Sequence, residues 1–104
     1  MRYRLLRTEQ ASRQLMEIGV YIAEESGSVE TALNVLQEME EALERLKDAP
    51  HMGSLPRAET LRRQGHRFLV IGNYLAFYRC DDAEKVVILT AVVHSKQDYR
   101  RVLL

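Results

Sequence analysis

Several side chains in the last third of the chain could transfer protons or stabilise negative charge on a phosphate group. They lie on or beside the predicted late strands and in the tail: Arg67, Arg79, His94, Lys96 and Tyr99. Only the imidazole of His94 has an ordinary pKa near neutrality, which suits it to act as a general acid or base. Structural roles are the alternative, because Tyr99 can pack its ring on a sheet and His94 can lie at a sheet margin.

The cysteine and histidine residues lack the spacing of a metal site. Cys80 is the single cysteine, and His51, His66 and His94 are scattered along the chain. We therefore expect neither a metal nor another cofactor. A lone cysteine cannot form an internal disulfide, and the N-terminal segment MRYRLLRTEQ has no apolar stretch typical of a signal peptide, so we expect a cytoplasmic protein.

The length and composition are those of one globular domain, which we assign to residues 1–104. The chain has 104 residues, of which 46% are hydrophobic and 29% charged. It contains no long uncharged run typical of a membrane protein, and chains of this length rarely hold two hydrophobic cores. Fifteen Lys/Arg balance fifteen Asp/Glu, which argues against a protein whose whole surface binds nucleic acid.

That balance conceals a segregation of charge along the chain. Residues 1–61 contain seven Lys/Arg and eleven Asp/Glu, whereas residues 62–104 contain eight and four. The two parts therefore carry about −4 and about +4. We expect target contacts in the basic part, and the candidates are Arg62, Arg63, Arg100 and Arg101.

The first half of the chain predicts a short strand followed by two helices. Residues 1–6 alternate between apolar and basic side chains, as a half-buried strand does. Thr8 can cap a helix that Gly27 ends, and Ser28 can cap a second helix that ends before Pro50. Apolar residues recur at helical spacing in both segments, so each helix has one buried face. The short connection makes the pair a helical hairpin.

The last third of the chain changes to strand-like patterns. The segments 68–71 and 74–80 flank a Gly72-Asn73 turn and predict a β-hairpin, and 85–93 predicts a third strand that is central or covered on both faces. The tail predicts a turn or short helix that folds Val102, Leu103 and Leu104 onto the domain. We predict an α+β fold, with the helical hairpin packed on one face of a small, mainly antiparallel sheet in the order β-α-α-β-β-β.

Four segments carry a likeness to a known family. They are Ile22-Ala23-Glu24; Leu46-Lys47-Asp48-Ala49-Pro50 with Gly53 after it; Asn73 to Arg79 (NYLAFYR); and Val93 to Tyr99 (VHSKQDY). Taken in this order, they resemble the RelE/ParE superfamily of toxins from bacterial type II toxin–antitoxin modules. The likeness covers nearly the whole chain. It implies a sheet-and-hairpin toxin that arrests growth and is held inactive by a cognate antitoxin.

The superfamily divides by target. RelE-like members are ribosome-dependent, metal-free mRNA endonucleases, whereas ParE-like members poison DNA gyrase. Under the nuclease alternative, the base, acid and cations of the reaction would come from His94, Lys96, Tyr99, Arg79 and Arg67. Under the ParE-like alternative, the protein acts as a protein–protein interactor and needs no catalytic group.

Three features favour the ParE-like alternative. RNA-cleaving members usually place an arginine directly after the tyrosine that corresponds to Tyr74, and this chain has Leu75. The net charge is zero, and the helical hairpin is long and well marked. We therefore expect gyrase as the target, with the mRNA interferase as the alternative. A third hypothesis is an inactive relative that acts only in co-repression of its operon.

The resemblance also implies an antitoxin as partner. Four apolar side chains at the edges of the two predicted helices could receive an antitoxin helix: Met16, Val20, Val35 and Met39. The alternative is that they pack within the domain. We expect no membrane partner.

Overall fold

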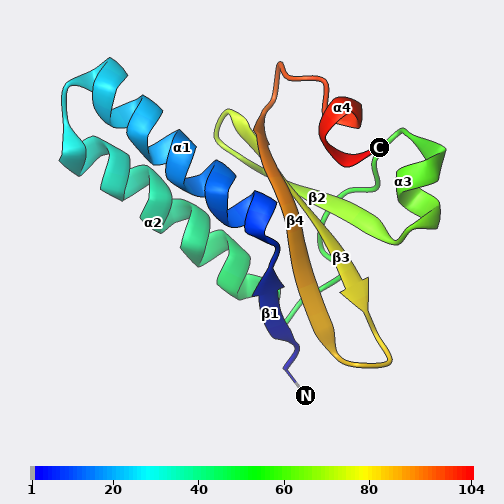
Figure 1. The fold of residues 1–104 in the computed structure, drawn as a ribbon. Coiled ribbons are helices and arrows are strands. Elements are labelled where there is room, and N and C mark those ends of the chain that lie inside the picture. Colours follow the sequence, from blue (N-terminus) through cyan, green and yellow to red (C-terminus); the bar gives the residue numbers. More distant parts are fainter. Residues whose placement is uncertain (1) are drawn as a thin grey trace.

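The fold has two layers, a helical hairpin and a four-stranded sheet (Figure 1). The computed structural model describes residues 2–104. Along the chain the elements are β1 (Arg4–Arg7), α1 (Glu9–Ser26), α2 (Val29–Arg45), α3 (Glu59–Arg63), β2 (His66–Ile71), β3 (Tyr74–Asp81), β4 (Val86–His94) and α4 (Arg100–Leu103). The predicted α+β class and its order of strands and long helices are confirmed.

The two long helices begin and end where their capping residues indicate. The Thr8 hydroxyl accepts a hydrogen bond from the N–H of Ala11 at 3.1 Å, which satisfies a donor of the first turn of α1. Gly27 ends α1 with φ of 68°, a left-handed conformation that glycine adopts at little cost. The Ser28 hydroxyl then accepts from Thr31 at 3.1 Å and starts α2. The hairpin is therefore encoded locally.

The strands are arranged in the order β1-β4-β3-β2. The pairs β2–β3 and β3–β4 are antiparallel, whereas β1 pairs in parallel with β4. This arrangement makes β4 a central strand over its first half, which agrees with its nearly continuous apolar sequence.

The pairing of β1 with β4 stops at Leu89, and side chains of α1 take over along the rest of that edge. Gln10 donates through Nε2 to the carbonyl of Thr90 at 3.1 Å. The N–H of Val92 donates to Oε1 of Gln14 at 2.8 Å. Helix α1 therefore lies beside the second half of β4 and satisfies part of its backbone.

Both faces of the sheet are covered by apolar side chains. The face toward the hairpin holds the larger cluster, which includes Leu15, Met39, Leu43, Tyr78 and Leu89. The opposite face holds a smaller cluster in which the tail covers the sheet: Phe77, Ala91 and Val93 pack with Tyr99, Val102 and Leu103. The predicted return of the tail is confirmed for Val102 and Leu103. It is wrong for Leu104, which is 57% exposed.

Several predicted boundaries differ from the structure by one to three residues, and one short helix was not predicted. The first strand is Arg4–Arg7 because it pairs with the start of β4, and Met1 lies outside the described residues. The connector expected around Gly53 and Pro56 is followed by a short helix, α3, which is only five residues long and too short to show a periodic pattern. Strand β2 begins at His66 rather than at Phe68, because His66 pairs with Arg79 of β3.

Candidate functional site

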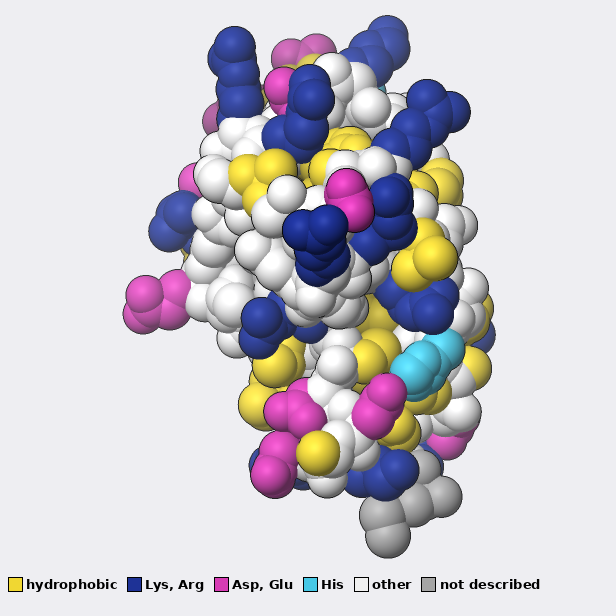
Figure 2. Space-filling view, turned by 90° about the vertical axis from the view of Figure 1, so that its right-hand side faces the viewer, with side chains coloured by type: hydrophobic (Ala, Val, Ile, Leu, Met, Phe, Trp, Pro, Cys, Tyr) yellow, Lys and Arg dark blue, Asp and Glu magenta, His cyan; other side chains and the backbone are white. Residues whose placement is uncertain are grey.

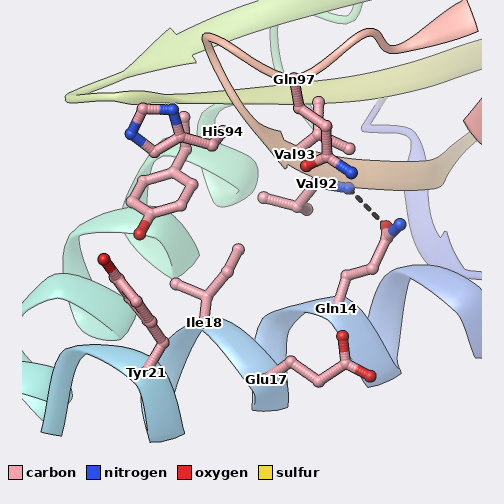
Figure 3. Close-up of a pocket in the computed structure, with 9 residues that line it drawn as sticks. Gln14, Glu17, Ile18, Tyr21, Val92, Val93, His94 and Gln97 are labelled. Atoms are coloured by element: carbon pink, nitrogen blue, oxygen red, sulfur yellow. Dashed lines mark hydrogen bonds between the residues drawn. The ribbon is translucent and has the colours of Figure 1, made fainter. Parts of the chain in front are cut away.

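A groove of about 400 Å³ lies between α1 and the end of β4 (Figure 3). One wall comes from α1, where steps of three and four residues place side chains on the same side of the helix. The other wall comes from the start of β3, the end of β4 and the turn that follows β4. The lining residues are Gln14, Glu17, Ile18, Tyr21, Tyr74, Val92, Val93, His94 and Gln97. The groove occurs where β1 no longer pairs with β4.

Aromatic and polar groups meet in this groove. The rings of Tyr74 and His94 lie edge to face, with centroids 5.4 Å apart. Burial raises the pKa of Tyr74, and the neighbouring phenol of Tyr21 raises it further. The N–H of Lys96 donates to Nδ1 of His94 at 3.2 Å, so the neutral ring carries its proton on Nε2. Apolar walls with a few polar groups are typical of sites that hold a ligand or a partner's side chains.

The four side chains predicted to contact an antitoxin differ in exposure. Met16 is 71% exposed and Val20 is 52% exposed, so both lie on the outer surface of α1. Val35 is half-buried between the helices and the core. Met39 is 1% exposed and packs in the larger cluster, so it belongs to the core and not to a docking surface.

The side chains that RNA cleavage would require are not brought together. His94 pairs with Tyr74 on the hairpin side of the sheet. Arg79 lies on the opposite face, five residues further along β3. At about 3.4 Å per residue, the backbones of His94 and Arg79 are roughly 17 Å apart. A base and a cation for one phosphate would have to lie within hydrogen-bonding distance of the same group.

Of the other three candidates for catalysis, Tyr99 and Arg67 are also separate from His94, whereas Lys96 lies next to it. The ring of Tyr99 packs on Phe77 with centroids 4.8 Å apart, on the face opposite His94. Lys96 is exposed in the turn after β4. The guanidinium of Arg67 donates to the carbonyl of Gly53 at 3.0 Å. Arg67 therefore holds the connector against the sheet.

Gly53 lies where a side chain has no room. A Cβ atom at this residue would lie 2.5 Å from the Tyr78 hydroxyl and 2.8 Å from the carbonyl oxygen of Phe68. The N–H of Gly53 donates to the same hydroxyl at 2.9 Å. The glycine in the family-like pattern therefore has a structural reason, which is the close approach of the connector to β2 and β3.

The arginines predicted to contact a target lie on α3 and α4. Arg62 and Arg63 are on α3, and Arg100 and Arg101 are on α4; all four are exposed. Seen from the side of the molecule that carries these helices, Lys and Arg side chains gather over the upper part of the surface (Figure 2). The two arginine pairs, which are far apart in the sequence, therefore lie on helices at the same side of the molecule (Figure 1).

The sequence did not reveal Gln14, Tyr21 and Tyr74 as lining residues of a groove. Two signals were present on α1. Tyr21 is a large aromatic side chain three residues after Ile18, beside the apolar stripe, and it is 57% exposed. Gln14 is a polar residue directly next to that stripe. The pattern of α1 alone, however, does not predict which strand lies opposite these side chains.

No metal site or membrane-spanning helix is found in the part of the chain that the structure describes. Among residues 2–104, no three His, Cys, Asp or Glu side chains come together as a metal site would need. None of the described helices combines the length and apolar character needed to cross a bilayer.

Comparison with known proteins gives the family. The model of the family described as ParE toxin of type II toxin-antitoxin system, parDE, matches residues 5–99. The chain belongs to the ParE toxin family. It is thus a toxin of the type II toxin–antitoxin class. A comparison with curated proteins gives no match.

Solved structures share the fold of this ParE-family toxin. The chromosomal ParDE system from P. aeruginosa has a TM-score of 0.74 at 21% identity, covering 90% of this chain and 97% of that chain. Free E. coli toxin RelE, a mutant form, has a TM-score of 0.69 at 16% identity, covering 99% and 96%. The RelBE2 complex from Mycobacterium tuberculosis has a TM-score of 0.62 at 23% identity, covering 90% and 92%. The RelE/ParE fold is therefore confirmed.

Proposed function

We propose that this ParE-family toxin arrests growth by binding DNA gyrase and does not cleave mRNA. The observation that carries the proposal is the dispersal of the candidate catalytic groups over two faces and two ends of the sheet. Metal-free RNA cleavage needs a base, an acid and cations around a single phosphate. Inhibition of gyrase by binding needs only a surface complementary to gyrase. The dispersal of the candidate catalytic groups is compatible with such a surface.

Leu75 supports the same proposal. Its side chain packs against the cluster of Phe77, Ala91 and Val93, under the tail. The RNA-cleaving members usually have an arginine at this position. An apolar side chain there offers no charge for a phosphate, and an arginine would bring a cation into an apolar cluster at a cost.

We also propose that a cognate antitoxin binds along the exposed side of α1. Met16 and Val20 present apolar surface there, and Tyr21 borders the groove beside β4. An amphipathic helix recognises such a surface through side chains spaced three and four residues apart. Solved relatives described as the ParDE system and the RelBE2 toxin–antitoxin complex support an antitoxin as the partner.

The supercoiling activity of gyrase tests the proposed target. Purified toxin added to gyrase and relaxed plasmid should reduce supercoiling in proportion to its concentration, and equimolar antitoxin should restore the activity. In parallel, the toxin is added to translating ribosomes with a labelled mRNA, which should stay intact. Normal supercoiling together with mRNA cleavage would overturn the proposal in favour of an mRNA interferase.

A single substitution sharpens this test. His94→Ala removes the only imidazole among the candidate catalytic groups, and general acid–base catalysis contributes about 10²–10⁴-fold in rate. We expect the variant to inhibit gyrase within a few-fold of the parent protein. If the variant is folded but its toxicity falls by orders of magnitude relative to the parent protein, His94 takes part in catalysis. If the parent protein does not slow growth when expressed alone, co-repression of its operon is the remaining hypothesis.

A further inference from the structure

The two short helices and the segments before them form a basic face. The segments 57–63 and 96–101 contain six cationic and two acidic residues: Arg57, Arg62, Arg63, Lys96, Arg100 and Arg101 against Glu59 and Asp98. All eight side chains are exposed. In Figure 2, Lys and Arg side chains stand over the upper part of the surface that carries α3 and α4. We use the term basic face for these eight residues.

Three cations of the basic face are not used within the molecule. Arg63 pairs with Glu59 at 2.8 Å and Arg100 with Asp98 at 3.2 Å. Arg62 donates to the carbonyl oxygens of Pro56 and Arg57. Within residues 2–104, the side chains of Arg57, Lys96 and Arg101 make neither an ion pair nor a hydrogen bond. The face therefore has an excess of cations available to an anionic partner.

Packing holds the two halves of this face next to each other. The ring of Tyr99 lies on Phe77 and anchors the start of α4 to the sheet. A hollow of about 400 Å³ separates α4 from the residues before α3, and Arg57 and Arg100 are among its lining residues. Asp98 also lines this hollow and pairs with Arg100, so an anion there would mainly meet the guanidinium of Arg57, which makes no ion pair within residues 2–104.

The opposite layer of the molecule repels the same partner. Residues 9–45, which form the helical hairpin, contain nine Asp/Glu and two Lys/Arg. A polyanion would therefore approach with the basic face and not with the hairpin, because like charges raise the energy of the other orientations. The zero net charge of the chain conceals this polarity.

We propose that the basic face binds the phosphate backbone of duplex DNA without reading its sequence. Arginine side chains match phosphate oxygens well, because the planar guanidinium can donate two parallel hydrogen bonds. Sequence reading in the major groove requires an element that enters it, and α3 and α4 have only five and four residues. Contacts to phosphates position a protein on DNA but carry no sequence information.

The aromatic side chains argue for duplex DNA over single-stranded nucleic acid. Proteins that bind single strands stack bases on exposed aromatic rings. The aromatic residue within the tail part of this face is Tyr99, whose ring is turned onto Phe77. The face therefore offers charge without a stacking surface. The inference does not depend on gyrase as the target, although a DNA contact would suit a protein that acts on a DNA-bound enzyme.

Fluorescence anisotropy with a labelled duplex of about 20 base pairs tests the inference at several salt concentrations. Each phosphate contact adds about 0.9 to the steepness of log K against log salt concentration. We expect measurable binding at low salt that weakens steeply as salt is added. In the double variant Arg57→Gln/Arg101→Gln the slope should fall by about 1.8, because two contacts are lost.

A matched control separates local contacts from overall charge. The double variant Arg13→Gln/Arg45→Gln removes the same charge from the hairpin, and its slope should equal that of the parent protein. Absence of duplex binding at low salt, an equal loss of slope in both double variants, or tighter binding to a single-stranded RNA of the same length would overturn the inference. Supercoiling assays with the same variants report on the proposed function independently.

Discussion

At the scale of single residues, His66 is the most unusual side chain. It is 5% exposed, and neither ring nitrogen has a hydrogen-bond partner among the described residues. Burial lowers its pKa, and the nearby charge of Arg79 lowers it further. The folded protein therefore holds a neutral imidazole beneath α3 and the tail. A buried polar group without a partner costs free energy, and here it also makes stability depend on pH.

We predict that the free energy of unfolding falls as the pH is lowered from 7 to 5, partly because of His66. The unfolded chain binds a proton at His66 near pH 6.5, whereas the folded chain resists this proton. The contribution of neutral His66 to the free energy of unfolding is complete above pH 6.5. It is lost as the pH falls toward the lower pKa that His66 has in the folded protein. The slope from one such group is at most about 1.4 kcal/mol per pH unit.

Urea unfolding at pH 5, 6, 7 and 8 measures this effect. In His66→Leu the pH dependence should be shallower between pH 5 and 7, with little change in slope above pH 7. His51→Leu is the matched control, because it removes an exposed histidine. Its Nε2 lies 3.0 Å from Oδ1 of Asp82. Parallel curves for the parent protein and His66→Leu would contradict the assignment.

At the scale of elements, the tail and α4 act as a cover over the second face of the sheet. Tyr99, Val102 and Leu103 pack on Phe77, Ala91 and Val93. The tail thereby hides apolar surface that the helical hairpin does not reach. This packing gives Tyr99 a structural role, which competes with the catalytic role expected under the nuclease alternative.

We predict that Tyr99→Ala and Tyr99→Phe have different effects. Tyr99→Ala should lower the free energy of unfolding by about 2–4 kcal/mol, because it removes a ring that contacts the cluster. Tyr99→Phe keeps the ring and should stay within about 0.5 kcal/mol of the parent protein. Leu104→Ala serves as a control in the same tail, because Leu104 is exposed.

The phenylalanine variant also tests the role of the hydroxyl. Under the proposed function, Tyr99→Phe should arrest growth as strongly as the parent protein does. A stable variant that no longer arrests growth would show that the hydroxyl takes part in chemistry. Thermal unfolding and growth after induction are the two measurements.

At the scale of the whole molecule, our two binding proposals place an antitoxin and DNA on different surfaces. The hairpin is acidic and carries exposed apolar residues on α1, whereas α3 and α4 form the basic face on the other side of the fold (Figures 1 and 2). An antitoxin on α1 and a DNA contact on the basic face would occupy separate surfaces. The antitoxin would then neutralise the toxin by covering the surface that contacts gyrase, by blocking gyrase sterically, or by both.

We predict that Val20→Ser weakens binding of the cognate antitoxin and that Val70→Ser does not. Both valines are exposed, at 52% and 66%, but Val20 lies on α1 and Val70 on β2. Loss of a central apolar contact should reduce affinity by roughly tenfold, which corresponds to about 1.4 kcal/mol. Titration calorimetry measures the dissociation constants.

A third variant reports on the groove itself. Tyr21→Ala removes a large side chain from its rim and should weaken antitoxin binding by at least as much, since aromatic residues often dominate interfaces. Equal effects of Val20→Ser and Val70→Ser, or unchanged affinity in Tyr21→Ala, would exclude this side of α1 as the docking surface.

Local sequence patterns predicted the helices, the strands and the family resemblance correctly. The capping residues Thr8 and Ser28, the left-handed Gly27 and the helical spacing of apolar residues all act within a few positions of the chain. Such patterns are readable because hydrogen bonds and side-chain directions in a helix or strand depend on near neighbours. The separation of charge between the hairpin and the basic part was also visible, because it needs only a count of charged residues along the chain.

Contacts between side chains from distant segments became visible only in the folded structure. Met16 and Met39 both lie on helices and have the same chemistry, yet Met16 is exposed and Met39 is buried. The parallel pairing of β1 with β4 and the burial of His66 involve segments far apart in the sequence. These outcomes depend on the packing of distant elements, which local patterns do not encode. The same packing keeps His94 and Arg79 apart and places the arginines of α3 and α4 on one side of the molecule.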